Sequence, residues 1–401
     1  MISFEEALEK ILAAVAPLPA YSIPLGDALG RVAADPIWSP VNLPPADNSS
    51  VDGYAVLVAD LASAGAGAPV TLRLAGCAPA GKTFPGQVEP GACVRVFTGS
   101  VLPRGADAIV MQEDVKTLPD QPRNILFFEK ARPWENVRFL GEDVKQNDIL
   151  LEEGGKITAG RIALLAAAGM DQVYCHRRPV VGLLATGNEL REAGEALAPG
   201  AIYESNRLSL ACLAGQAGAV AKIPPLVKDD LAVTKFALEQ AFAQCDAVVT
   251  MGGVSVGEAD WVRTAFAEIG GQLDFWNIAL KPGKPFAFGR RAGKLFFGLP
   301  GNPVSALVSF FLLVRPALLR MQGARDILPR SHAARLVEPL ANDGERRHFM
   351  RVTVDSAGQA RLAGIQASHI LSATARANGL VDVAPKTTLP AGAVVQVLRW
   401  D

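Results

Sequence analysis

The stretch "DAVVTMGGVSVGEADWV", residues 246–262, carries the main signals of the fold in one segment. It begins with a short apolar run, which is typical of a strand buried on both faces of a parallel sheet. Two glycines follow, and Glu258 and Asp260 stand where the chain should enter a helix. A strand, a tight turn and a helix in this order predict one unit of an α/β sheet, with the turn at the carboxyl end of the strand.

The same alternation continues on both sides of this segment. "PVVGLLATGNEL" (179–190) predicts another buried strand, and "SNRLSLACLAGQAGA" (205–219) predicts a helix with Ser205 at its N-cap. "GLPGNPVSA" (298–306) predicts a third strand that leads into a helix with Pro303 in its first turn. We therefore expect a parallel, doubly wound sheet over this part of the chain.

The flanking regions follow other patterns. Residues 70–115 contain short β-rich runs interrupted by Gly and Pro, which predict an all-β module. Helical periodicity precedes this module at 1–19 and follows it at 156–170, where Gly169 is a candidate C-cap, so the β module is inserted into a helical domain. Alternating strands return after about Leu328 and predict a separate C-terminal β domain.

Composition limits the classes of protein that the chain can belong to. A length of 401 residues suggests roughly two to four domains, and 50% hydrophobic residues are enough to fill several cores. The net charge of -1 gives no general reason to expect nucleic acid or an anionic membrane as a partner. The cysteines and histidines are dispersed without a CxxC pair, so a zinc cage or a disulfide framework is not expected.

No targeting or membrane segment is predicted. The N-terminus has acids at Glu5, Glu6 and Glu9 where a signal peptide would carry a basic segment, so it is interpreted as an amphipathic helix. The most apolar run, "VSALVSFFLLV" (304–314), is far shorter than the roughly 20 residues that span a bilayer. We expect a buried helix there and a cytoplasmic protein.

Three loops are expected at the carboxyl edge of the sheet, where ligands bind in doubly wound folds. They carry Glu189, the pair Glu258 and Asp260, and the pair Asn302 and Ser305. The glycines would let backbone N–H groups approach a phosphate, and the helix start at Asn302 could hold one. The structural alternative is simple helix capping by Asn302 and a favourable macrodipole interaction of the two acids.

A fourth segment, "KPGKPFAFG", places Lys281 and Lys284 around a Pro-Gly turn. Lysines on a surface turn are commonly only solvated, but here Phe286 and Phe288 follow and the ammonium groups would be available to an anion. Cations near carboxylates favour a phosphate together with a divalent metal, because Mg²⁺ prefers a few carboxylate oxygens with substrate phosphate and water.

These segments, taken together, resemble those of the molybdopterin molybdotransferases, the MoeA and gephyrin E-domain family. Nine motifs occur in the family's order across nearly the whole chain, and only their combination is specific. They are "SVDGYAV", "FTGS", "GEDV", "ATGNEL", "SNRLSL", "GGVSVGEAD", "KPGKPFAFG", "GLPGNPVSAL" and "ANGL".

The resemblance implies a multidomain α/β plus β fold of four parts. These are a discontinuous helical linker domain (1–45 and 144–178), an inserted β domain (46–143), an α/β molybdopterin-binding sheet domain (179–327) and a C-terminal β barrel (328–401). It also implies a homodimer whose active sites are built from both subunits. Other molybdenum cofactor biosynthesis proteins are further partners that the resemblance suggests.

The implied reaction is insertion of molybdate into adenylylated molybdopterin, with Mg²⁺-dependent release of AMP. Carried over by motif, the catalytic residues are Asp260, Glu189, Asp229, Asp52, Asp143 and Thr98, of which Asp260, Glu189 and Asp229 are also the candidate metal ligands. The substrate-binding residues are Lys281, Lys284, Arg351, Ser368, Pro300, Pro303, Ser205, Gly252, Gly253 and Ser255.

The sequence departs from the family pattern in a few places. Asn188 stands where the family usually has Asp, which puts a metal role there in doubt, and Val51 replaces a usual Met before Asp52. "QASHIL" replaces a commoner Gly-Ser-Gly around Ser368, so that loop is expected to be stiffer. The choice of Asp229 over its neighbour Asp230 rests on motif register.

Two other functions remain open on the sequence. The sheet domain could instead adenylylate molybdopterin, as a related single-domain family does, or the chain could be a non-enzymatic scaffold. The complete four-part organisation favours insertion over adenylylation, and the intact lysine and acid loops favour catalysis over a scaffold.

Overall fold

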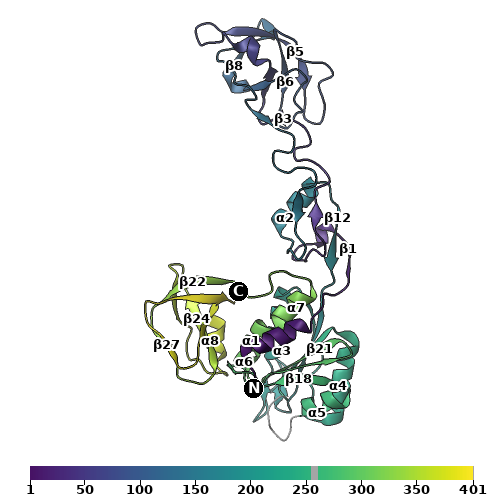
Figure 1. The fold of residues 1–401 in the computed structure, drawn as a ribbon, viewed down its shortest axis with the longest axis vertical. Helices are drawn as coiled ribbons and strands as arrows, with labels where there is room; N and C mark the ends of the chain where they lie inside the picture. Colours follow the sequence, from purple (N-terminus) through teal and green to yellow (C-terminus); the bar gives the residue numbers. More distant parts are fainter. Residues whose placement is uncertain (254–260, 401) are drawn as a thin grey trace.

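The computed structural model describes residues 1–253 and 261–400. They form an elongated molecule with the inserted β domain at one end and the linker in the middle (Figure 1). The sheet domain and the C-terminal domain lie side by side at the other end (Figure 1). The expected multidomain α/β plus β architecture is confirmed, and the domain boundaries given above stay predictions.

The sheet domain has a six-stranded sheet in the order β16-β13-β17-β21-β20-β18. The four strands from β16 to β21 are parallel, as predicted, whereas β20 and β18 pair antiparallel at the far edge. The strands are β13 (Val180–Ala185), β16 (Val220–Lys222), β17 (Ala247–Met251), β18 (Gln272–Trp276), β20 (Ala287–Arg291) and β21 (Lys294–Leu299), with a small parallel pair β14 (Leu190–Arg191) and β15 (Ile202–Tyr203) beside them.

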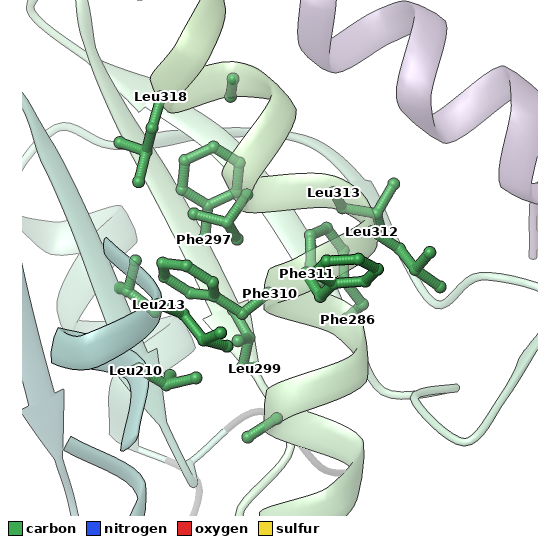
Figure 2. Close-up of a cluster of buried hydrophobic side chains, with 14 of the residues drawn as sticks. Leu210, Leu213, Phe286, Phe297, Leu299, Phe310, Phe311, Leu312, Leu313 and Leu318 are labelled. Carbon is green, nitrogen blue, oxygen red and sulfur yellow. The ribbon is translucent and has the colours of Figure 1, made fainter. Parts of the chain in front are cut away.

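Helices cover both faces of this sheet, as a doubly wound fold requires. One core cluster holds residues of α4 (Leu231–Gln244) and α5 (Trp261–Glu268) against the strands. The larger cluster lies on the other face and includes α3 (Asn206–Gln216) and the helix that follows β21. Figure 2 shows Phe310 of that helix beside Leu213 and Leu299 of this cluster.

The helix after β21 is continuous from Pro303 to Met321 and contains one π-helical turn. Its parts are α6 (Pro303–Ser309), the π turn η4 (Phe310–Val314) and α7 (Arg315–Met321). Pro316 has no N–H to donate to the carbonyl four residues earlier, which accounts for the widened turn just before it. This helix is long and apolar enough to cross a membrane, but 83% of its most apolar window is buried, as the sequence predicted for a core helix.

The predicted N-terminal helix is present as α1 (Phe4–Ala13), with the Ser3 side chain accepting from the Glu6 N–H. Its fully buried Ala7 and Ile11 belong to the large cluster of the sheet domain. This helix therefore packs on the sheet domain, although its residues fall within the range 1–45 that was predicted for the linker.

The linker contains α2 (Ala159–Ala167), which ends before Gly169 at φ +83°, where the sequence predicted a C-cap. Two antiparallel pairs complete it and share one small core with α2. They are β1 (Ala20–Pro24) with β12 (Gln172–His176), and β2 (Ile37–Trp38) with β11 (Ile149–Leu151), joined by the 3-10 turn η1 (Leu25–Asp27).

The inserted domain is a six-stranded sheet in the order β7-β4-β6-β5-β9-β8, as the Gly- and Pro-interrupted sequence predicted. The chain enters and leaves it side by side, through an antiparallel pair of β3 (Asn48–Ser49) and β10 (Val137–Arg138). Its strands are β4 (Gly53–Val56), β5 (Val70–Ala78), β6 (Ala92–Val96), β7 (Ala108–Met111), β8 (Val115–Leu118) and β9 (Gln121–Phe127), with 3-10 turns η2 (Val58–Leu61) and η3 (Gln112–Asp114).

The C-terminal domain is a closed barrel, as expected. The strand order runs β24-β25-β22-β28-β26, and β26 pairs again with β24, so the barrel wall is continuous. Its elements are β22 (Ser331–Leu336), β24 (Arg347–Val354), β25 (Gln359–Leu362), β26 (Gly379–Val383) and β28 (Val394–Arg399), with the pair β23 (Leu340–Asn342) and β27 (Thr387–Leu389) and helix α8 (Leu371–Arg376). Strand β19 (Leu280–Lys281) joins β24 in parallel and ties the sheet domain to the barrel.

Candidate functional site

The loops that follow β13, β17 and β21 meet at the carboxyl edge of the sheet. The Thr186 N–H donates to Met251 O over 3.1 Å, and the Gly252 N–H donates to Leu299 O over 3.2 Å. A Cβ placed on Gly301 would lie 3.6 Å from Gly252 Cα. The three loops that the sequence predicted to converge are therefore in contact, because parallel strands end at the same edge.

Gly252 and Gly253 could not be other residues without rearrangement. Their φ angles are +87° and +66°. A Cβ would lie 2.9 Å from Thr186 O at the first position and 2.3 Å from Val262 Cγ2 at the second. The loop continues into the predicted Ser255, Glu258 and Asp260, which lie outside the described residues.

Thr186 Oγ1 is a buried polar atom beside these glycines. This atom is buried and has no hydrogen-bond partner among the described residues. It lies 3.2 Å and 3.1 Å from the Cβ positions built on Gly252 and Gly253. Because an unpaired buried polar group costs roughly 1–3 kcal/mol, a bound oxygen atom is a natural partner for it.

Asp229 and Glu189 bring two carboxylates to this edge. The Asn188 N–H donates to Asp229 Oδ2 over 3.1 Å, and the Asp229 N–H donates to Asn188 Oδ1 over 3.3 Å. The Glu189 carboxylate lies within 2.9 Å of a Cβ built on Gly187, so it folds back over the same loop. Asn188, the departure from the family pattern, thus holds Asp229 in place.

The structure also separates Asp229 from its neighbour. Asp230 is the N-cap of α4, and its Oδ1 accepts from the Val233 N–H over 2.9 Å. The Asp230 side chain is used for capping, whereas the Asp229 side chain lies in the loop beside Asn188. This geometry supports the choice that motif register suggested.

The start of α6 is capped from the barrel. Asn302 and Pro303 occupy the N-cap and first helical positions, as predicted, but the Asn302 side chain makes no cap bond. Instead the Val304 N–H donates to Ser368 O over 3.2 Å. Ser368 therefore meets this helix through its backbone carbonyl. The neighbouring Pro300 directly follows β21 in the same loop.

Asn206 links α3 to the same loop. Its Nδ2 donates to Gly301 O over 2.8 Å, and its Oδ1 is buried without a hydrogen-bond partner among the described residues. Asn206 and Thr186 are functional candidates that the sequence prediction missed. Both lie in motifs that were recognised, but a sequence cannot show which polar atoms lack a partner.

The α3 cap differs from the sequence prediction. Ser205 occupies the N-cap position without a side-chain bond, and Glu204 Oε1 accepts from the Asn206 and Arg207 N–H groups instead. Buried Arg207 also donates to Glu204 and to Glu192. The pKa of Arg207 is raised: desolvation, the largest single influence, lowers it, but the hydrogen bonds that Arg207 donates to Glu192 and Glu204 and the charges of these carboxylates together outweigh desolvation.

The lysine turn rests on α6. A Cβ on Gly283, at φ +118°, would lie 2.4 Å from Ser309 Oγ, so only glycine fits between the turn and the helix. Lys281 is half-buried and Lys284 is exposed. The lysine turn and the Ser368 loop thus both pack on α6, the helix that begins at Pro303.

His348, opposite Lys281 in the β19–β24 pair, is a buried histidine with no partner for either ring nitrogen among the described residues. Burial, followed by the charges of Lys281, Arg351 and Arg346, lowers its pKa to about 4. The imidazole is therefore neutral near pH 7 and adds no charge to this cationic region.

Arg351, predicted to bind substrate, donates several hydrogen bonds within the barrel. The guanidinium is 2% exposed, and its donors are engaged by Gln366 Oε1, Thr374 Oγ1 and three carbonyls, those of Ile365, Ala367 and Ile370. The planar fork thus holds the loop that carries Ser368 and is not open to a substrate oxyanion in this structure. Gln366, which the sequence prediction did not single out, pairs with the Arg351 backbone on both sides.

Asp52 and Thr98 lie together, but in the inserted domain. Asp52 Oδ1 accepts from the Thr98 N–H over 2.8 Å and from Thr98 Oγ1 over 2.9 Å. These two bonds, the backbone one first, lower the pKa of Asp52. Exposed Asp143 follows β10 where the chain leaves the insert. Figure 1 places this domain at the opposite end of the molecule from the sheet, so these residues do not meet Asp229 within one chain.

The donor set suits a hard divalent cation that shares its coordination with a ligand. No group of three or more His, Cys, Asp or Glu side chains is positioned to hold a metal among residues 1–253 and 261–400. Mg²⁺, however, commonly takes only one or two protein carboxylates and completes its shell with phosphate and water. Asp229 and Glu189, on loops at the same edge of the sheet, fit that chemistry.

Family comparisons agree with this architecture part by part. Residues 2–169 match the MoeA N-terminal region (domain I and II), residues 182–320 a probable molybdopterin binding domain, and residues 333–400 the MoeA C-terminal region (domain IV). The class of protein is thus one built around a molybdopterin-binding-type sheet.

Full-length relatives narrow this to one family. The chain is 38% identical over 385 residues to a molybdopterin molybdenumtransferase of Haemophilus influenzae, covering 94% of this chain and 93% of that one. It is 36% identical to molybdopterin molybdenumtransferase 2 of Mycobacterium tuberculosis, with 95% and 94% coverage. A crystal structure of a molybdopterin biosynthesis MoeA protein from Pyrococcus horikoshii matches with a TM-score of 0.87 at 29% identity, covering all of both chains. The chain belongs to the MoeA family.

Proposed function

We propose that this protein is a molybdopterin molybdenumtransferase, an enzyme of molybdenum cofactor biosynthesis that inserts molybdate into molybdopterin. The observation that carries the proposal is the meeting of three strand-end loops at the carboxyl edge of the sheet, where Thr186 Oγ1 lies unpaired beside Gly252 and Gly253 and the Asn188 N–H holds Asp229. The family membership and the names of its full-length relatives support the same activity.

The proposed substrate is adenylylated molybdopterin, and the reaction releases AMP. Glycine-rich backbone at Gly252 and Gly253 allows a phosphate to approach closely, and Lys281 and Lys284 supply positive charge for it and for the tetrahedral molybdate dianion. Thr186 and Asn206 orient substrate oxygens or amino groups through their unpaired atoms. Bound Mg²⁺ would neutralise developing negative charge on the phosphate.

The carboxylates of this site hold water and cation. The hydrogen bond from the Asn188 N–H fixes the Asp229 carboxylate, so this group would offer its oxygens to a cation or water from one position. The Glu189 carboxylate lies over Gly187 of the same loop. Arg351 acts indirectly: it holds the loop whose Ser368 carbonyl caps α6. We assign it a positioning role in place of the direct contact first expected.

The proposal includes a homodimer with composite sites and a cytoplasmic location. Asp52, Thr98 and Asp143 lie far from the sheet-domain site of their own chain, so a second copy is required if they act on the same substrate (Figure 1). Among residues 1–253 and 261–400, one helix is long and apolar enough to span a bilayer, and it is largely buried, which supports a protein that does not enter a bilayer.

The test is a turnover assay with purified protein, molybdate, Mg²⁺ and adenylylated molybdopterin. We expect AMP release that depends on molybdate and formation of a molybdenum-loaded product, both reduced by at least about 100-fold in Asp229→Asn. Asp343→Asn, an exposed acid of the barrel, is the matched control. Release of pyrophosphate from ATP in the presence of molybdopterin would instead show that the protein adenylylates molybdopterin. Inactivity in both assays would favour a non-enzymatic scaffold.

A further inference from the structure

The base of the lysine turn is held by backbone hydrogen bonds to the segment that precedes β19. The Ile278 N–H donates to Lys284 O over 3.1 Å, and the Asn277 N–H donates to Phe286 O over 2.8 Å. Ile278 itself is fully buried. The lysine turn therefore keeps its position only as long as residues 277–281 keep theirs.

The first residues of the chain form the other side of this segment. The Ile2 N–H donates to Asn277 O over 3.3 Å, and the Ala279 N–H donates to Ile2 O over 2.8 Å. Ile2 thus pairs in parallel with Ile278. Helix α1 begins two residues later, and its buried residues anchor it on the sheet domain. The N-terminal segment, residues 2–5, therefore lies directly against the base of the lysine turn.

Arg347 joins this N-terminal segment to the barrel. It stands opposite Leu280 in the β19–β24 pair. Its Nε donates to both carboxylate oxygens of Asp382 in β26, over 2.7 and 2.8 Å, and its guanidinium also forms an ion pair with Glu5 of α1. The guanidinium lies 5.4 Å from the centre of the Phe4 ring, within the range of a cation–π contact. One side chain thus links α1 to the barrel from the strand that pairs with β19.

The charges around this junction make it depend on Arg347. A cavity of about 390 Å³ lies between the start of α1 and the barrel, and Arg347 is the only cationic side chain among the described residues that line it. The cavity is also lined by three carboxylates, those of Glu5, Glu345 and Asp382. Glu345 pairs separately with Lys386 at 2.9 Å. Arg347 is therefore the cation between Glu5 and Asp382, and without it these two carboxylates would repel each other across the junction.

We propose that Arg347 is a positioning residue for the lysine turn: by tying α1 to the barrel, it keeps the N-terminal segment paired with Ile278 and so fixes the two lysines. This role rests on one part of the proposed function, the binding of an anion by Lys281 and Lys284. A loosened junction would let the N-terminal segment separate from residue 278. The turn would then spend less time in the arrangement that binds a dianion, and anion affinity would fall.

Calorimetric titration of the full-length protein with molybdate tests this role, together with hydrogen–deuterium exchange of the amides of residues 277–286. In Arg347→Gln we expect molybdate binding about tenfold weaker and faster exchange in this segment, because the ion pairs and the cation–π contact are lost together. Arg347→Lys should recover part of the affinity, since lysine keeps a cation between the carboxylates but makes fewer directed bonds. A second variant, Phe4→Ala combined with Glu5→Gln, removes the partners on α1 and should also weaken binding.

A double-mutant cycle with Lys284→Gln separates positioning from a general loss of stability. Lys284→Gln alone should weaken molybdate binding, because it removes a cation from the turn. If Arg347 acts through this turn, adding Arg347→Gln to Lys284→Gln should weaken binding by clearly less than it does in the wild type. Losses that simply add would place the effect of Arg347 elsewhere and overturn the proposal.

Two matched controls change similar charges away from the junction. Glu9→Gln alters an exposed acid one turn further along α1. Arg361→Gln removes a barrel arginine that forms an exposed ion pair with Asp355. Both variants should bind molybdate and exchange their amides as the wild type does.

The proposal fails if Arg347→Gln binds molybdate with wild-type affinity, whatever its exchange rates, or if the wild-type protein binds no molybdate at millimolar concentration. The proposed enzymatic function is judged separately, by molybdate-dependent release of AMP. Turnover by the wild type with normal molybdate binding by Arg347→Gln would refute only the positioning role. Weaker binding by Arg347→Gln without any turnover by the wild type would support the positioning role and refute the enzymatic function.

Discussion

At the scale of single residues, Asp52 shows how hydrogen bonds stabilise the ionised form of a carboxyl group. The two bonds from Thr98 favour the ionised carboxylate, so the Asp52 pKa lies below its ordinary value of 3.8. The stabilisation that these bonds give is therefore present above pH 3.8 and is lost as the pH falls through the lowered pKa. Near neutral pH the carboxylate is fully ionised.

Replacing Thr98 by valine separates the effects of the backbone and side-chain hydrogen bonds on the Asp52 pKa. The backbone N–H remains while the hydroxyl is lost, so we expect the Asp52 pKa to rise but to stay below 3.8. Carbon-13 NMR titration of the Asp52 carboxyl measures this directly. An unchanged pKa in Thr98→Val would show that the side-chain bond has no effect in solution.

Arg351 gives a second residue-scale prediction. Because its guanidinium binds several carbonyls of one loop, Arg351→Ala leaves buried acceptors unpaired and should lower the free energy of unfolding by at least about 3 kcal/mol. Arg361→Ala, which removes only an exposed ion pair with Asp355, should cost less than about 1 kcal/mol. Urea denaturation of both variants compares them, and equal losses would contradict the proposed positioning role.

The residue scale is also where sequence-based prediction was weakest. Periodicity located the strand that precedes Gly252, so the sequence placed this glycine at a strand end, as the structure has it. The motif for Arg351 suggested substrate contact, whereas the folded chain engages its donors internally. Which donor meets which acceptor depends on the packing of the barrel against α6, and no local pattern contains that information.

At the scale of elements, the helix starts decide the geometry of the site. Strands β13, β17 and β21 and helices α3 and α6 of the sheet domain were predictable from continuous apolar runs and cap residues. The cap of α3 was not, because Glu204 replaces the Ser205 side chain only once Arg207 and Glu192 are in place around it. A tertiary network has here replaced a local preference.

Glu204→Gln tests that network. Glu204 and Arg207 are both nearly inaccessible to solvent, so removing the negative charge leaves Arg207 with only the more exposed Glu192. We expect a loss of about 3–5 kcal/mol in the free energy of unfolding. Glu268→Gln, which breaks the exposed pair with Lys235, should change the stability by less than about 1 kcal/mol when both are measured by thermal unfolding.

At the scale of the whole molecule, the separation of Asp52 from Asp229 predicts complementation between subunits. Asp52→Ala and Asp229→Ala should each be nearly inactive alone. After subunit exchange, a heterodimer has one site with both residues intact, so equal mixing should restore roughly a quarter of wild-type activity. Proven exchange without recovery would mean that each site is complete within one chain.

The inserted domain has a further consequence that follows from how it is attached. Leu43 and Val144 are joined by a backbone hydrogen bond, and β3 pairs with β10 just beyond them, so the two chain crossings lie next to each other. A segment with adjacent ends can be gained or deleted in a single genetic event without pulling apart the host, because the gap it leaves is closed by a very short join. A shortened gene that joins residue 43 to residue 144 should therefore still yield a folded linker, sheet and barrel.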